Sequence, residues 1–168
     1  MISDYFGYET VDIRNLYPAS TLVALYLKQE MPDVKKVRVI GNEQLIEELH
    51  SHGIETSGGT FDDEKYNDPK KAMEIEQVDA YELDPEVGAV VQGNDPAFNM
   101  SKLCIGSLYL QKGLKWVITN TDKFGTTATG RRIYGCGAAV AAMEATVSTT
   151  DGLMCEKVCV GKPSPSIL

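Results

Sequence analysis

Residues 116–122 read Trp-Val-Ile-Thr-Asn-Thr-Asp, an apolar and largely β-branched run that passes directly into polar side chains. A short run of this kind is typical of a buried strand in a parallel sheet. Open α/β sheets bind their ligands outside the carboxyl ends of such strands. The segment predicts a strand over 116–119, with Asn120 and Asp122 where a ligand would bind. Asp122 could orient a substrate hydroxyl or amine; alternatively, Asn120 or Asp122 closes a side-chain turn.

Three other short, β-branched runs predict strands at 37–40, 89–92 and 157–160. Helical patterns lie between the strands, at 19–29, after Asn42, after Asn99 and after Gly135-Cys136-Gly137. In the helix after Asn99 we expect one face to carry the apolar residues Met100, Leu103, Cys104 and Leu108. Alternating strands and helices predict an α/β fold with a mostly parallel sheet and helices on both faces.

Two polar stretches suggest boundaries in the chain. Residues 31–36 separate the first helix from the first strand, and residues 149–152 separate the last long helix from the last strand. We therefore expect residues 37–150 to fold as a unit, flanked by 1–36 and 151–168.

The acidity of the chain is concentrated in one segment. The formal net charge is −8, and residues 56–86 hold ten Asp or Glu against three Lys, a net of −7. We interpret this segment as a solvated loop or surface insertion. The negative net charge disfavours a nucleic-acid partner.

No apolar run is long enough for a membrane span, and residues 1–5 lack a secretory pattern, so we expect a cytoplasmic protein.

The cysteines do not predict a metal or redox site. None of Cys104, Cys136, Cys155 and Cys159 belongs to a Cys-x-x-Cys pair, and the two histidines lie far away in sequence. Zinc and structural disulfides are therefore not expected. The glycines around Cys136 could expose N–H groups to an anion at a helix start, or simply form a tight turn. Cys136 itself has no basic partner in sequence that would activate it as a nucleophile.

The sharpest local motif is Gly161-Lys162-Pro163-Ser164-Pro165, directly after the last predicted strand. A lysine at the carboxyl end of a strand can hold a phosphate as a point charge. Ser164 could cap a following helix. The alternative is an ordinary surface turn, and the similar turn at Gly93-Asn94-Asp95-Pro96 has the same two interpretations.

These pieces occur in the order found in one known family. The chain resembles the 4-nitrophenylphosphatase and phosphoglycolate/pyridoxal phosphatase branch of the haloacid dehalogenase superfamily, which has a large α/β cap. The resemblance covers nearly the whole length and rests on the following segments: 19–20, 24–27, 39–41, 45–49, 89–96, 119–122, 135–137 and 161–165.

The resemblance implies that residues 37–150 are the cap domain and that 1–36 and 151–168 are remnants of the catalytic core. Lys162 matches the lysine that steadies the nucleophile and the transferred phosphoryl group. Asp122 and its neighbours match the cap loop over the substrate, so Asn120, Asp122, Lys123 and Ser164 are the expected substrate-binding residues. Some relatives carry a histidine near Phe124, and this chain does not, so substrate specificity is not transferred.

Family members use an Asp-x-Asp pair, whose first Asp forms an aspartyl-phosphate and whose second is the general acid/base, together with magnesium. No Asp-x-Asp occurs in these 168 residues. We therefore expect a fragment of a magnesium-dependent phosphatase of small phosphorylated substrates, inactive alone and binding no metal itself. We also expect a homodimer, through apolar surface that includes Val158 and Val160.

Two other hypotheses remain open. The chain could be a non-catalytic, cap-like module that binds a partner or self-associates. A nucleotide-binding domain is less favoured, because the glycine fingerprint of dinucleotide sites is missing.

Overall fold

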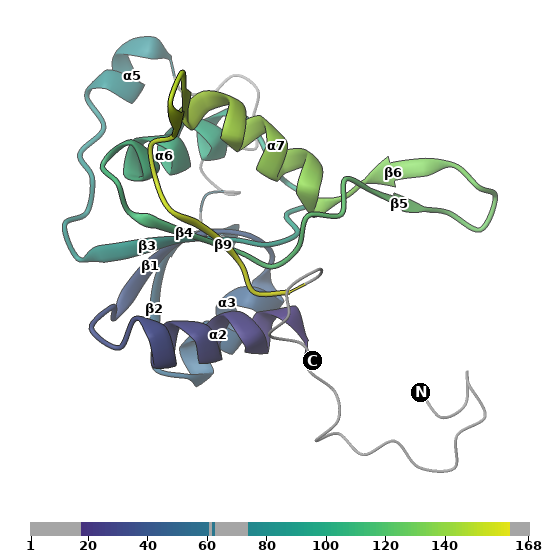
Figure 1. The fold of residues 1–168 in the computed structure, drawn as a ribbon, viewed down its shortest axis with the longest axis horizontal. Coiled ribbons are helices and arrows are strands. Elements are labelled where there is room, and N and C mark those ends of the chain that lie inside the picture. Colours follow the sequence, from purple (N-terminus) through teal and green to yellow (C-terminus); the bar gives the residue numbers. More distant parts are fainter. Residues whose placement is uncertain (1–17, 61, 63–73, 162–168) are drawn as a thin grey trace.

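The fold is described from a computed structural model, over residues 18–60, 62 and 74–161. Within these residues a five-stranded sheet has the order β2-β1-β3-β4-β9, and every neighbouring pair is parallel (Figure 1). Its strands are β1 (Lys36–Ile40), β2 (Glu55–Gly58), β3 (Val87–Gln92), β4 (Lys115–Ile118) and β9 (Lys157–Cys159). The predicted α/β fold with a mostly parallel sheet is confirmed.

Helices cover both faces of the sheet, as predicted (Figure 1). One face carries α2 (Ala19–Glu30) and α3 (Glu43–Ser51), which pack against each other. The other carries α6 (Met100–Gln111) and α7 (Cys136–Val147), with the short α5 (Ile75–Asp79) beyond α6. Two small antiparallel pairs complete the described elements: β5 (Phe124–Thr126) with β6 (Arg132–Tyr134), and β7 (Ser148–Thr149) with β8 (Gly152–Leu153). None of the helices described is long and apolar enough to cross a membrane.

The predicted helix starts are made by asparagine caps. The Asn42 side chain accepts the backbone N–H of Leu45, and the Asn99 side chain accepts that of Lys102. Each cap satisfies one of the N–H groups that an α-helix leaves unpaired in its first turn. Both helices begin directly after a strand and its short loop, which fixes the crossover back across the sheet.

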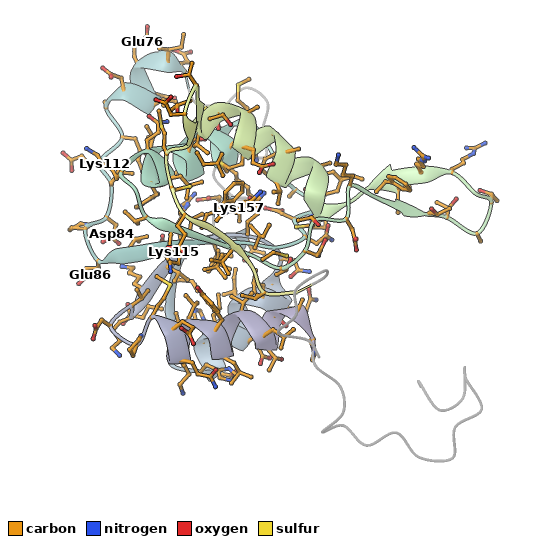
Figure 2. The ribbon with its side chains drawn as sticks, viewed as in Figure 1. Glu76, Asp84, Glu86, Lys112, Lys115 and Lys157 are labelled. Atoms are coloured by element: carbon orange, nitrogen blue, oxygen red, sulfur yellow. The ribbon has the colours of Figure 1, made fainter. Side chains whose placement is uncertain are left out.

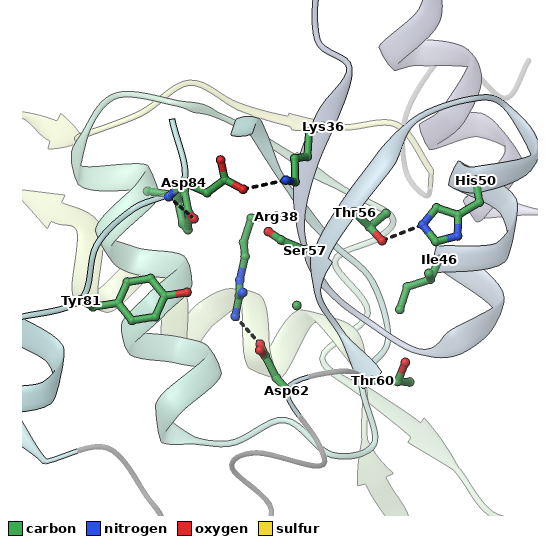
Figure 3. A pocket seen from close by; sticks show the side chains of 12 residues that line it. Lys36, Arg38, Ile46, His50, Thr56, Ser57, Thr60, Asp62, Tyr81 and Asp84 are labelled. Carbon is green, nitrogen blue, oxygen red and sulfur yellow. Dashed lines mark hydrogen bonds and ion pairs between the residues drawn. The ribbon is translucent and has the colours of Figure 1, made fainter. Parts of the chain in front are cut away.

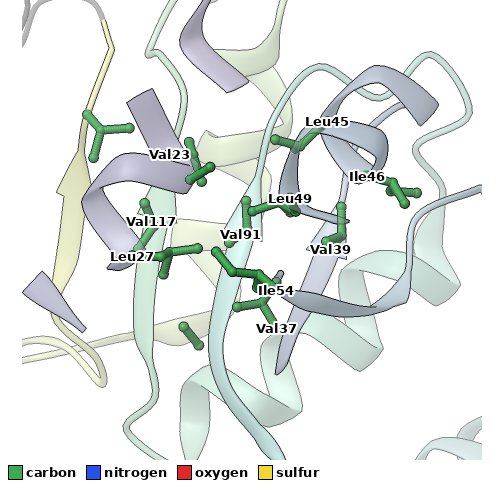
Figure 4. Close-up of a cluster of buried hydrophobic side chains, with 13 residues drawn as sticks. Val23, Leu27, Val37, Val39, Leu45, Ile46, Leu49, Ile54, Val91 and Val117 are labelled. Carbon is green, nitrogen blue, oxygen red and sulfur yellow. The ribbon is translucent and has the colours of Figure 1, made fainter. Parts of the chain in front are cut away.

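Two apolar clusters sandwich the sheet. The first lies between the sheet and α2 with α3, and Figure 4 shows Leu27, Leu49 and Val39 among its side chains, with Val91 between Leu27 and Leu49. The second lies under α6 and α7 and contains the fully buried Trp116 and Met143. Successive residues of β1 and β4 alternate between the clusters, as the pleat of a strand requires.

Helix α6 does not turn the apolar face that carries Met100, Leu103, Cys104 and Leu108 toward the sheet. Met100 is 69% exposed, and Leu103, Cys104 and Leu108 are only half-buried. The helix turns its other side to the sheet, and the buried residues are Ser101, Lys102, Ile105, Gly106, Ser107, Tyr109 and Leu110. A Cβ built at Gly106 would lie 2.6 Å from Ile40 and 2.8 Å from Met143, so the glycine allows the helix to approach both neighbours closely. In α7, Val140 and Val147 are buried, whereas Ala141 is exposed.

Two surface predictions need correction. Part of the acidic segment is structural rather than a solvated loop, because residues 55–58 form the edge strand β2 and Asp62 is 4% exposed. Val160 is 2% exposed and therefore offers no apolar surface to a second copy, whereas Val158 is half-buried against the α2–α3 cluster.

Residues on both sides of the 37–150 unit pack into the same body. Helix α2 packs on α3, and β9 pairs with β4 through Val158 opposite Val117. The division into 1–36, 37–150 and 151–168 stays a prediction.

Candidate functional site

Four strands end at one edge of the sheet, and backbone hydrogen bonds join the loops that follow them. Gly93 N–H donates to Ile40, Thr119 N–H to Gln92, and Val160 N–H to Ile118, at 2.8–3.0 Å. Asn42 N–H donates to the Asn94 carbonyl at 3.1 Å, which joins the loops after β1 and β3. This carboxyl edge is where an open α/β sheet binds ligands.

The loop after β4 holds three of the predicted substrate-binding residues. Asn120 is half-buried, whereas Asp122 and Lys123 are exposed. The Asn120 side-chain oxygen accepts the Asp122 N–H at 3.1 Å, and its amide donates to Thr119 Oγ1 at 3.3 Å. Asn120 therefore closes the side-chain turn, one of the two alternatives that the sequence left open. The turn leaves the Asp122 carboxylate and the Lys123 ammonium at the surface.

Three glycines let neighbouring backbones approach this loop. A Cβ added at Gly137 would lie 2.2 Å from the Thr121 carbonyl oxygen, and one at Gly135 2.4 Å from that of Asp122. A Cβ added at Gly161 would lie 1.8 Å from the Thr119 carbonyl oxygen. Real Cβ atoms do not approach so closely, so glycine is required at each position. The loop is clamped between the start of α7 and the residue that precedes Lys162 in sequence.

Backbone N–H groups in the first turn of α7 already donate hydrogen bonds to carbonyl groups of the protein. The Gly137 N–H donates to the Asp122 carbonyl at 2.8 Å, and the Ala138 N–H donates to Gly135 at 2.9 Å. Cys136 is 3% exposed, and burial raises the pKa of its thiol, although Thr119 Oγ1 lies 3.7 Å from the sulfur. A neutral, buried thiol is a poor nucleophile. The glycines therefore serve close packing, and Cys136 is a packing residue.

A hairpin that the sequence did not predict projects from this edge (Figure 1). Strands β5 and β6 pair Phe124 with Tyr134, and the Arg132 guanidinium lies 4.1 Å from the Phe124 ring centroid. Phe124, Ile133 and Tyr134 are 46%, 55% and 43% exposed. Each strand has only three residues, too few for an alternating pattern to stand out. The sequence clue to the hairpin was a turn glycine, Gly130, which has φ 78° in the structure.

The described residues provide no site that fits a magnesium ion. Across residues 18–60, 62 and 74–161, no three His, Cys, Asp or Glu side chains come together as metal ligands would. Of the other predicted site residues, Lys162 and Ser164 lie outside the part of the chain that the structure describes.

Comparisons with known proteins agree with this geometry. No family model matches the chain. It is 35% identical over 161 residues to phosphoglycolate phosphatase 2 of Arabidopsis thaliana, which covers 94% of this chain and 50% of that protein. It is 33% identical over 131 residues to the 4-nitrophenylphosphatase of Schizosaccharomyces pombe, which covers 75% of this chain and 41% of that protein. The chain belongs to the haloacid dehalogenase-type phosphatases. It spans half or less of the length of the curated family members that it matches.

Solved structures of phosphatases share the fold. The glycerol phosphate phosphatase of Mycobacterium tuberculosis in complex with magnesium superposes with a TM-score of 0.69 at 21% identity, over 98% of this chain and 41% of that one. The p-nitrophenyl phosphatase of Archaeoglobus fulgidus gives a TM-score of 0.59 at 24% identity, over 83% and 43% of the two chains. The resemblance inferred from the sequence is therefore confirmed at the level of family and fold.

Proposed function

We propose that this chain is the substrate-covering part of a phosphate monoester hydrolase that uses magnesium and an aspartyl-phosphate intermediate. The observation that carries the proposal is the convergence of Thr119 and Gly161. The loop that bears Asn120 and Asp122 touches the residue immediately before Lys162. The loop that the resemblance assigns to the cap over the substrate therefore lies against the segment that leads to Lys162, and this supports the proposal.

In this proposal Lys162 contacts the transferred phosphoryl group, and Ser164 supports the same loop. Asn120, Asp122 and Lys123 contact the rest of the substrate. The exposed Asp122 carboxylate suits a substrate hydroxyl or amine, and the Lys123 ammonium suits an anionic group. The nucleophilic aspartate, the general acid/base and the magnesium ligands would belong to other parts of the parent protein, because these 168 residues hold no Asp-x-Asp pair.

The substrate class is a small phosphorylated metabolite. Phosphoglycolate, glycerol phosphate and aryl phosphates are the classes that the names of the relatives suggest. We further propose that the protein is cytoplasmic and forms a homodimer. The exposed apolar side chains of Phe124, Ile133 and Tyr134 on the projecting hairpin favour self-association. Sedimentation of a hairpin variant with Phe124 and Ile133 changed to Ser tests the dimer.

A chimera tests the catalytic proposal. This chain would replace the matching half of the Arabidopsis phosphoglycolate phosphatase, whose remainder supplies the missing aspartates. The folded chimera should hydrolyse phosphoglycolate or 4-nitrophenyl phosphate with magnesium, whereas the 168-residue chain alone should not. Lys162→Met should lower kcat by roughly 10²–10³-fold, as the loss of one transition-state charge contact does. Asp122→Ala should mainly raise KM.

The control for Lys162→Met is Lys112→Met. Lys112 follows α6 and lies far from the projecting hairpin (Figure 2), so its loss should leave turnover unchanged. A folded chimera without turnover would support the alternative function, a non-catalytic module that binds a partner or self-associates.

A further inference from the structure

A pocket of about 480 Å³ lies along the sheet edge formed by β2. Strands β1, β3 and β4 separate β2 from β9. The pocket is lined by residues of both β1 and β2, so it lies two to three strand spacings, roughly 10–14 Å across the sheet, from β4, where the phosphatase proposal places its substrate. Figure 3 shows Arg38 at its centre, with Ser57 beside it and the Tyr81 hydroxyl pointing toward it.

Arg38 is unusual for a strand residue because its side chain is only 3% exposed. Its Nη2 group donates to the Asp62 carboxylate, which neutralises the charge. Its Nε–H group is buried and has no hydrogen-bond partner among the described residues. A buried donor without an acceptor costs about 1–3 kcal/mol, so an arginine held in this state needs an explanation.

The backbone next to Arg38 is shaped around the guanidinium. Gly58 has φ 85°, and a Cβ added there would lie 2.6 Å from Arg38 Cζ and 2.8 Å from Nη1. Any other residue at position 58 would push the guanidinium away. The group is therefore held in a fixed position by the edge strand.

Two more donors face the same pocket. Ser57 is the register partner of Arg38 on β2, and its buried Oγ also has no partner among the described residues. The Tyr109 hydroxyl accepts the Asp84 backbone N–H at 3.1 Å, which leaves its own proton to donate. Arg38 Nε, Ser57 Oγ and Tyr109 Oη thus offer hydrogens, and the lining carboxylates are already paired, Asp62 with Arg38 and Asp84 with Lys36.

We propose that this pocket binds a small organic monocarboxylate, whose oxygens accept hydrogen bonds from Arg38 Nε, Ser57 Oγ and Tyr109 Oη. Lys36 pairs with Asp84 and Glu86, and Arg38 pairs with Asp62, so these groups leave no net positive charge to compensate a dianion such as phosphate. A carboxylate brings one charge and two acceptor atoms. The rings of Tyr81 and Tyr109 line the pocket beside these donors and would contact the carbon skeleton.

The proposal is tested on the full 168-residue chain by following the Arg38 Nε–H resonance in ¹⁵N-correlated NMR spectra. Acetate, butyrate and benzoate are the probes, and inorganic phosphate and chloride are the comparators. The carboxylates should shift the resonance saturably, with tighter binding as the carbon skeleton grows. Ser57→Ala should weaken binding about tenfold, since one hydrogen bond to a charged group is lost. Tyr109→Phe, which keeps the ring, should weaken it similarly.

The matched control is Ser148→Ala, because Ser148 is an exposed serine whose hydroxyl donates to the Glu144 carbonyl at the end of α7. This variant should bind the carboxylates unchanged. The proposal is overturned if no carboxylate gives a saturable shift, or if phosphate or chloride gives the same one. It is also overturned if folded Ser57→Ala and Tyr109→Phe both bind as the parent chain does.

Discussion

Lys102 and Asp95 form an ion pair in the interior, with Nζ 2.7 Å from Oδ2 and side chains 0% and 2% exposed. Asp95 follows β3, and its other carboxylate oxygen accepts the Ala97 N–H at 2.9 Å. Lys102 lies in the first turn of α6, just after its Asn99 cap. The pair therefore fastens the loop after β3 to the helix that follows it, at the same sheet edge as the proposed substrate site.

Removing the lysine should destabilise the fold strongly. Lys102→Met leaves the Asp95 carboxylate buried without its cation, so we expect the free energy of unfolding to fall by about 3–5 kcal/mol. Urea denaturation, monitored by circular dichroism, measures this loss of unfolding free energy. The control is Lys115→Met, which removes the partially exposed ion pair with Glu156 and should cost less than about 1 kcal/mol. Equal losses in the two variants would contradict the structural role given to Lys102.

The glycine clamp on the loop after β4 gives a second prediction. Gly137→Ala places a Cβ against the Thr121 carbonyl, so the loop or the start of α7 must shift, at a cost of about 1–3 kcal/mol. Gly125→Ala is the matched control, because its Cβ would meet only Ile133 side-chain atoms, at 3.4 Å and beyond. The midpoint of thermal unfolding should fall in Gly137→Ala and not in Gly125→Ala. Amide hydrogen exchange should become faster at Asn120 and Asp122 only in Gly137→Ala. Unchanged exchange there would show that the clamp does not hold the loop.

The sequence predicted four of the five strands, including the edge strand β9, and missed the edge strand β2, for a physical reason. Strands β1, β3 and β4 are buried on both faces, and their runs of valine and isoleucine are conspicuous. Strand β2 reads Glu-Thr-Ser-Gly and contains no apolar run. It lies at an edge of the sheet, with a neighbouring strand on one side only. Its place in the sheet follows from the pairing of Arg38 with Ser57, a contact between distant segments that no local pattern contains.

The site was predicted in part for the same reason. The position of Asn120 and Asp122 at the carboxyl edge of the sheet was predicted because they directly follow a recognisable strand, and their contact with substrate stays a prediction. The inward face of α6 was missed, because a buried Lys102 is tolerated only when Asp95 lies opposite it. The pocket around Arg38 was also missed, because an arginine within an apolar strand gives no sign of being buried until its partner Asp62 is placed.

A third prediction concerns the reactivity of Cys136. Its thiol is buried, and burial raises its pKa, so little thiolate is present at neutral pH. Iodoacetamide should modify Cys136 only as fast as the fold opens, and urea should accelerate the reaction. Peptide mass spectrometry after timed quenching distinguishes Cys136 from the half-buried Cys104, which serves as the internal comparison. Modification at the rate of an unfolded peptide would contradict the placement of Cys136 in the core.

The last prediction is a pH dependence at the projecting hairpin. Burial, with smaller contributions from the charges of Cys136 and Asp95, raises the pKa of Tyr134 from its ordinary value of 10.0 to about 12. The unfolded chain loses this proton first as pH rises, so the contribution of Tyr134 to stability is complete below pH 10 and is lost toward pH 12. Because Tyr134 is 43% exposed, solvent screening keeps the effect small.

Ultraviolet difference titration of the eight tyrosines measures this shift directly. The Tyr134→Phe variant should lack the phenolate signal that develops above the ordinary tyrosine range, while the signal near pH 10 stays the same. Its stability to urea should also fall less steeply between pH 10 and 12 than that of the parent chain, because one proton no longer differs between the folded and unfolded states. If the variant instead loses signal near pH 10, Tyr134 is fully solvated, which would contradict its partial burial in the structure.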